Sequence, residues 1–201
     1  IIVLAVGMLT ENGVNAFSGI LEFFSSPFCG NGICQVVLTG IQANLGDFAV
    51  FIARQNLART YVDVGRAKEA AEILEQVRGP LTELLGPDHM ALLAASHSLA
   101  KAWIAVGRTA EGIELAEEVL RRRTEVVGAD HPETLKSLAQ LGKAYRATND
   151  LEKAADVLQK LVVGARKRFG NEAEFTISAA FALATTFRDQ GDVEQAATVV
   201  D

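Results

Sequence analysis

The chain has 201 residues, of which 49% are hydrophobic and 22% are charged, and its 25 acidic residues outnumber the 19 basic ones. This much apolar surface can fill the core of one or two domains and excludes a disordered tail. The net charge of −6, with no block of Lys and Arg, makes nucleic acid a poor partner, because phosphates bind clustered cations.

The two ends and the cysteines indicate the context of the chain. It starts at Ile1 instead of Met and ends at Asp201 without a polar tail, so we interpret it as a piece of a longer polypeptide. Two cysteines in this length do not make a disulfide framework, and we therefore expect a reducing, cytoplasmic compartment.

Charge is almost absent from the first part of the chain. Only Glu11 and Glu22 are charged between Ile1 and Gly46, and this step in composition is the predicted domain boundary. The apolar run at residues 1–9 follows no basic residue and is shorter than the roughly 20 residues of a membrane span. We interpret it as a buried helix or strand and expect no association with a membrane.

Residues 1–45 are predicted to form an irregular, helical N-terminal cap with a loop at 25–32. Cys29 and Cys34 flank a glycine-rich turn in this region. A zinc site would need two more soft ligands nearby, and none is visible in the sequence. A disulfide is geometrically possible, but we expect two reduced, largely buried thiols.

Residues 46–201 repeat with a period of 42, and the aligned positions form columns of leucine, a small residue, an aromatic ring and a turn former. The leucines are Leu57, Leu99, Leu141 and Leu183, and the small residues after them are Ala58, Ala100, Gly142 and Ala184. The rings are Tyr61, Trp103, Tyr145 and Phe187, and the turn formers are Gly65, Gly107, Asn149 and Gly191. The period predicts units at about 46–86, 87–128, 129–170 and 171–201, the last one truncated.

Each unit is predicted to contain two helices, as the third unit illustrates. Asp130 is the predicted N-cap of its first helix, with Pro132 early in the helix and Glu133 three residues after the cap. Asn149 is predicted to end this helix in the left-handed conformation, and Asp150 to cap the second helix.

The small residues allow two helices to approach closely, while leucine and aromatic side chains fill the space beside the crossing. One hairpin buries too little surface to be stable, so neighbouring hairpins must stack. The predicted fold is therefore all-α, a right-handed superhelical solenoid of antiparallel helix hairpins. The first unit departs from the pattern at Gly79-Pro80, where the proline is expected to kink or split the second helix.

The order of leucine, small residue, aromatic ring, glycine and a further small residue resembles the tetratricopeptide repeat. The further small residues are Ala70, Gly112, Ala154 and Ala196. The turn sequences at 85–89 and 127–134 resemble the 42-residue variety known from kinesin light chains and from repeat arrays attached to NTPase-type receptors. The resemblance covers about residues 46–201 and implies a protein-interaction scaffold. A HEAT-type repeat has a compatible length but a different column pattern.

Signatures of catalysis are missing from the sequence. It contains no phosphate-binding loop, no nucleophile elbow and no His-Glu-x-x-His motif. His89 and His131 occupy equivalent turns, and we interpret them as turn residues, because a metal or catalytic site needs further converging ligands. We therefore predict no enzymatic activity, no metal and no cofactor.

The resemblance also implies a ligand groove along the first helix of each unit, into which the residue two positions after each leucine points. Three of these residues are cations, and polar residues precede the leucines and can bond a peptide backbone. The predicted groove residues are Asn56, Arg59, His97, Lys101, Gln140, Lys143, Arg146 and Arg188. The carboxylate clamp of some family members is not expected, because Gln55, Arg59 and Ser98 stand where that clamp needs other residues.

The predicted function is a scaffold that binds a peptide segment, with acidic residues, of a protein partner. A solvated helix face whose cations serve only solubility remains an equal interpretation of the same residues. Two further alternatives are a regulatory or sensor arm of an NTPase receptor or effector, and a self-association module that pairs through the exposed end of the stack.

Overall fold

The structure is a computed structural model that describes the backbone of residues 32–200 and the side chains of residues 48–199. Throughout this described part, all regular secondary structure is α-helical. The helices are α3 (Gly32–Asp63), α4 (Ala67–Leu85), α5 (Met90–Ala105), α6 (Thr109–Val127), α7 (Pro132–Ala147), α8 (Leu151–Phe169), α9 (Glu174–Gln190) and α10 (Val193–Val200). The predictions for residues 1–31 and for the side chain of Cys34 lie outside the described residues.

The chain divides into two compact units, Ile1–Ile52 and Ala53–Asp201. Of the first unit, the structure describes a helical backbone from Gly32 onward, which belongs to α3. This helix has 32 residues, whereas α5 and α7 have 16 each. The predicted domain boundary near residue 46 and the bounds of the four units stay predictions.

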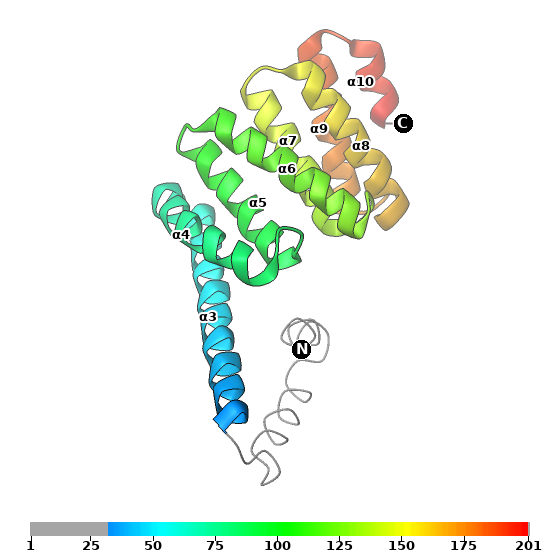
Figure 1. The fold of residues 1–201 in the computed structure, drawn as a ribbon. Coiled ribbons are helices and arrows are strands. Elements are labelled where there is room, and N and C mark those ends of the chain that lie inside the picture. The colour runs from blue at the N-terminus through cyan, green and yellow to red at the C-terminus, as the bar shows by residue number, and fades with distance from the viewer. Residues whose placement is uncertain (1–31, 201) are drawn as a thin grey trace. The chain divides into compact units, whose positions relative to one another are not determined.

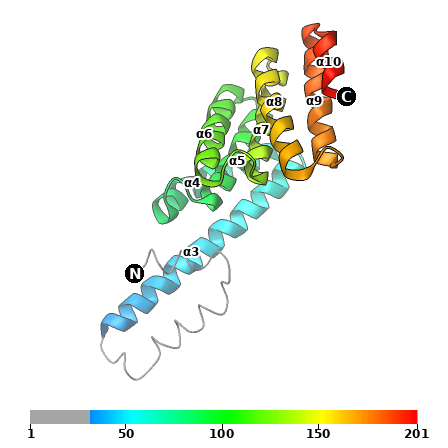
Figure 2. The same ribbon diagram turned by 90° about the vertical axis from the view of Figure 1, so that its right-hand side faces the viewer.

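The second unit is a stack of helix hairpins. From α4 to α10, every helix packs against the next one in the chain, and α5 also contacts α7. Figures 1 and 2 show these helices side by side in chain order, each hairpin next to the following one. The predicted all-α solenoid of stacked hairpins is confirmed.

The column of turn formers ends the first helix of each hairpin. Gly107 has a φ of +91°, and Asn149 has a φ of +60°, the one positive φ of a residue other than glycine in the described part of the chain. Asn149 therefore adopts the left-handed conformation predicted for it. The Asp150 side chain then accepts a hydrogen bond from the Lys153 N–H at 3.3 Å, which confirms Asp150 as the cap of α8.

The leucine and small-residue columns form the core of the stack. Leu99, Leu141 and Ala100 are at most 1% exposed. A Cβ added to Gly142 would lie 2.6 Å from Cδ2 of Leu158, so α7 and α8 touch at this point more closely than an alanine permits. Leu57 is the exception among the leucines, with 45% of its surface exposed.

The predicted N-cap of α7 is wrong. His131, not Asp130, is the cap, and its Nδ1 atom accepts a hydrogen bond from the Glu133 N–H at 3.2 Å. His89 caps α5 in the same way, by accepting from the Ala91 N–H at 3.1 Å. A neutral imidazole offers one acceptor nitrogen and can replace the side-chain oxygen of an ordinary cap. Asp130 forms an ion pair with Lys167 of α8 instead.

The expected split at Pro80 does not occur, because α4 continues as one helix from Ala67 to Leu85. Gly79, Pro80 and Gln76 are all exposed. The proline ring is thus open to water, and water can also bond the carbonyl group of Gln76 that the missing N–H leaves without its helical partner.

Candidate functional site

The predicted groove residues lie on the first helices of successive hairpins. Asn56 and Arg59 belong to α3, His97 and Lys101 to α5, Gln140, Lys143 and Arg146 to α7, and Arg188 to α9. The structure brings half of this set together. His97, Lys101, Gln140 and Lys143 line one cavity of about 420 Å³, which we call the first groove cavity.

A second groove cavity of about 240 Å³ adjoins the first one. Lys143 and Phe175 line both cavities, and Arg146 lines only the second. The wall of the second cavity is largely apolar, with Leu158 and Leu161 of α8 and Ala179 of α9. Neither cavity is lined by Asn56, Arg59 or Arg188. We refer to the surface of α5, α7 and α9 around the two cavities as the candidate groove.

Carboxylates partly neutralise the cations of the candidate groove. Lys101 Nζ lies 2.9 Å from Asp63 Oδ1. Arg146 and Arg188 each lie 3.1 Å from Asp189, on its two different oxygens. The hydrogen bond from Lys101 lowers the pKa of Asp63, and hydrogen bonds from Arg188 and then Arg146 lower that of Asp189, so both acids are ionised at neutral pH.

Lys143 differs from the other cations. Within 4.0 Å it has no acidic partner among residues 48–199, although it lines both groove cavities. An anion that enters the candidate groove therefore meets one ammonium group that no described carboxylate neutralises. Such an anion can therefore form an ion pair with Lys143 without breaking an ion pair within the protein.

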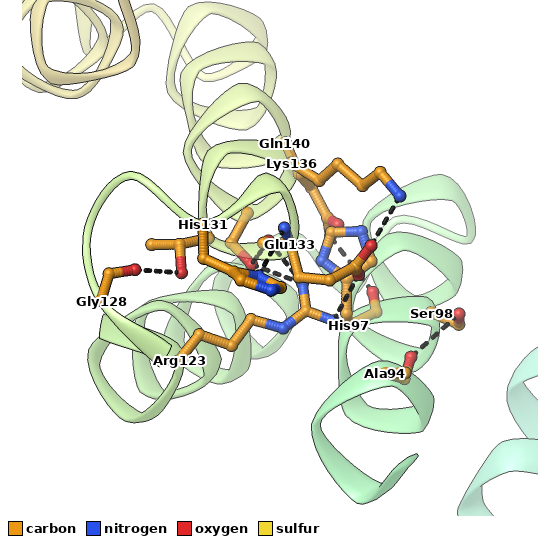
Figure 3. Close-up of polar contacts among 11 residues, drawn as sticks. Ala94, His97, Ser98, Arg123, Gly128, His131, Glu133, Lys136 and Gln140 are labelled. Carbon is orange, nitrogen blue, oxygen red and sulfur yellow. Dashed lines mark hydrogen bonds and ion pairs between the residues drawn. The ribbon is translucent and has the colours of Figure 1, made fainter. Parts of the chain in front are cut away.

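His97 contributes no charge to the candidate groove at neutral pH. Burial and the nearby positive charge of Arg123 lower its pKa from 6.5 to about 4. Its backbone carbonyl accepts a hydrogen bond from Gln140 Nε2 at 3.4 Å, which joins α5 to α7 (Figure 3). The Oε1 atom of Gln140 is buried and accepts no hydrogen bond from any described residue.

Lys136 and Phe175 are among the lining residues of the candidate groove that were not predicted from the sequence. Lys136 lines the first cavity beside His97, and Phe175 stands at the border of the two cavities. The aligned positions of the other units hold Ala94 and Ser178 in place of Lys136, and Ala91 and Glu133 in place of Phe175. The column pattern therefore carried no signal for either residue.

A third cavity, of about 990 Å³, lies between α6 and α8 and was not predicted either. Leu120, Leu138, Val157 and Val163 give it an apolar lining. Two ion pairs at its rim form within one helix, Arg121 with Glu125 at 2.9 Å and Lys160 with Asp156 at 2.7 Å, and Asp130 pairs with Lys167. This surface therefore offers mainly apolar area.

Two further findings concern the described residues alone. They contain no group of three or more His, Cys, Asp and Glu side chains arranged to hold a metal ion. None of their helices is long and apolar enough to cross a membrane.

The fold and the groove define a class of protein, the helical-repeat arrays that bind other proteins. The tetratricopeptide repeat family matches the chain at residues 52–89, 95–162 and 177–201. No curated protein matches the chain.

Similar solved structures show which kind of helical-repeat protein the chain resembles. The nearly identical TPR-like repeats of a kinesin light chain candidate from Podosopora anserina share 31% of their sequence with this chain, with a TM-score of 0.68. The match covers 73% of this chain and 70% of that one. BtubC (BKLC) from P. vanneervenii is 16% identical over 77% of this chain and 62% of its own, and its TM-score of 0.70 shows the shared fold. The chain belongs to the tetratricopeptide repeat family and is of the kinesin-light-chain-like variety, a protein-interaction repeat module.

Proposed function

We propose that this module binds an acidic peptide segment of a partner protein in the candidate groove and has no catalytic activity of its own. A cytoplasmic, reducing location belongs to the same proposal. The observation that carries it is the first groove cavity, where four of the predicted residues converge on one space of about 420 Å³.

The charges of the candidate groove favour an acidic ligand. Lys143 offers a cation without a described partner, and Lys101 and Arg146 can exchange Asp63 and Asp189 for carboxylates of the peptide. Such an exchange replaces one exposed ion pair by another, so its free-energy cost is small. The peptide then gains charge-assisted hydrogen bonds at positions one repeat apart.

The polar and apolar walls favour an extended chain. Gln140 lines the first groove cavity, and a side-chain amide at this position can bond the backbone of a peptide. The second groove cavity, between Phe175 and Leu158, has room for an apolar side chain of the ligand. Specificity would then come from side chains on both sides of the acidic residue.

The proposal is tested by fluorescence anisotropy with labelled octa-glutamate, and with octa-lysine as the probe of opposite charge. At about 50 mM salt, where screening is mild, octa-glutamate should bind and octa-lysine should not. Lys101→Glu with Lys143→Glu should weaken the binding, whereas the control Lys160→Glu, an exposed lysine of α8, should not. Equal affinities of the double variant and the wild type would refute the proposal.

A further inference from the structure

Four polar residues meet at one place in the stack where the other units have apolar or small residues. Arg123 of α6 aligns with Leu81 and Ala165, and Glu133 of α7 aligns with Ala91 and Phe175. Lys136 aligns with Ala94 and Ser178, and Ser137 with Ala95 and Ala179. The repeats thus supply an internal comparison, which shows that this cluster is not needed to build the hairpin stack.

Arg123 lies at the buried end of the cluster. It is 0% exposed, and its Nη1 atom donates hydrogen bonds of 2.8 Å to the backbone oxygen of Glu133 and to Ser137 Oγ (Figure 3). Its Nη2 atom lies 3.1 Å from Glu133 Oε2. Neither Nη2 nor Nε donates a well-aligned hydrogen bond to a described residue. The buried guanidinium of Arg123 therefore has N–H donors next to the Glu133 carboxylate that are not used in hydrogen bonds.

Glu133 links the buried arginine to the candidate groove. Its Oε1 atom accepts a hydrogen bond of 2.6 Å from Lys136 Nζ, and Lys136 lines the first groove cavity. The side chain of Glu133 is 31% exposed and that of Lys136 is 59% exposed. One carboxylate thus contacts an exposed cation of the groove on one side and a buried cation on the other.

We propose that the Glu133 carboxylate competes with the carboxylates of a bound peptide for Lys136. In the free protein it neutralises Lys136, and when a peptide carboxylate takes its place there, the Glu133 carboxylate turns fully onto the unused donors of Arg123. Arg123 never touches the peptide in this scheme. It is a positioning residue that keeps the displaced carboxylate paired, since an unpaired charge at this depth would be costly. This inference rests on the proposed function, because it describes the regulation of the same groove.

Other ion pairs of the groove lack a buried cation, and this holds also for Asp189, whose two partners Arg146 and Arg188 are 34% and 66% exposed. Asp63 pairs with Lys101, at 2.9 Å, and both side chains are more than half exposed. A peptide that displaces Asp63 releases it into water, where it needs no second cation. Glu133 is held against the core instead, and Arg123 therefore determines how readily Lys136 becomes available.

The test is anisotropy with labelled octa-glutamate on the full chain and four variants. Glu133→Gln removes the competitor and should bind the probe about two- to fivefold more tightly, the range of an exposed ion pair. Arg123→Leu, which copies Leu81 of the first unit, should bind about two- to fivefold more weakly. The double variant should bind as tightly as Glu133→Gln alone, because no carboxylate is left to displace. The control Glu125→Gln removes one negative charge on α6, outside the groove, where Glu125 pairs with Arg121.

Each outcome decides between the two proposals. If octa-glutamate binds none of these proteins, the proposed function is wrong and this inference with it. If the wild type binds the probe and Glu133→Gln gains no more affinity than Glu125→Gln, only the inference is overturned. Circular dichroism checks that each variant folds. If Arg123→Leu does not fold, the double variant Glu133→Gln with Lys136→Gln replaces it in the test. The tighter binding of octa-glutamate that Glu133→Gln causes must disappear in this double variant, because Lys136 is absent.

Discussion

The indole Nε1 of Trp103 donates a hydrogen bond of 2.7 Å to Glu75, which lies on the second helix of the preceding hairpin. One repeat later, the hydroxyl of Tyr145 donates to Glu117 in the same way. The aligned pair of the next repeat is Phe187 and Gln159, and a phenylalanine cannot donate. The aromatic column therefore joins hairpins by polar contacts as well as by packing, and the last junction lacks such a bond.

Replacing Tyr145 by Phe should destabilise the stack by about 0.5–1.5 kcal/mol, because Glu117 loses a donor that water replaces only in part at this exposed carboxylate. The free energy of unfolding from urea titrations measures the effect. Phe187→Tyr is the matched control, because it adds a hydroxyl in the same column next to Gln159. It should not lower the stability. A loss in Phe187→Tyr as large as that in Tyr145→Phe would contradict the role of the hydrogen bond.

Gly142→Ala should destabilise the protein by about 1–3 kcal/mol, although the same column holds alanine in the other units. The reason is local, because the new Cβ would lie 2.6 Å from Leu158 Cδ2. Thermal melts of the variant and the wild type measure the effect. A melting temperature of Gly142→Ala equal to or above that of the wild type would contradict the close contact of α7 and α8.

His97 should make the stability depend on pH between 6.5 and 4. Its pKa in the folded protein, about 4, lies below the ordinary value of 6.5, so the folded state binds fewer protons in this interval. Stability is therefore complete above pH 6.5 and decreases as the pH falls towards 4, by up to about 3 kcal/mol. His97→Gln, which introduces the residue found at the aligned position Gln55 of the first unit, should remove this decrease in the free energy of unfolding between pH 6.5 and 4. The comparison uses unfolding titrations of both proteins at several pH values, and parallel pH profiles would exclude the histidine as the cause.

His131→Ala should cost about 1 kcal/mol through the lost N-cap of α7. His131→Asn should retain most of the stability, because the amide oxygen can accept the same hydrogen bond from the Glu133 N–H. Asp130→Ala, at the position predicted from the sequence, tests the alternative. If thermal melts show that this variant loses more stability than His131→Ala, the assignment of the cap is wrong.

The repeat pattern predicted the hairpins because packing at a helix crossing depends on the size of a few residues. Ala100 and Gly142 are small where the helices touch, and Leu99 and Leu141 fill the space beside them, so a column of residue types is enough. The cap of α7 was mistaken because Asp130 and His131 both carry acceptors and only the backbone geometry selects between them.

The charges of the groove could be predicted only in part. Asp63 and Asp189 occupy a column that holds Ala105 and Ala147 in the middle units, so their pairing with Lys101 and Arg146 leaves no repeating signal. The burial of Arg123 could not be predicted from the sequence either, because arginine side chains usually lie at the surface. Such contacts depend on which side chains neighbouring hairpins bring together, and the spacing along the chain does not contain that information.

The most direct test of peptide binding in the candidate groove is an NMR titration of the labelled protein with octa-glutamate. We expect the backbone amide signals of Lys101, Gln140, Lys143 and Phe175 to shift together and to saturate at one peptide per chain. Shifts confined to α6 and α8, around Val157 and Val163, would place the peptide in the third cavity and contradict binding in the groove.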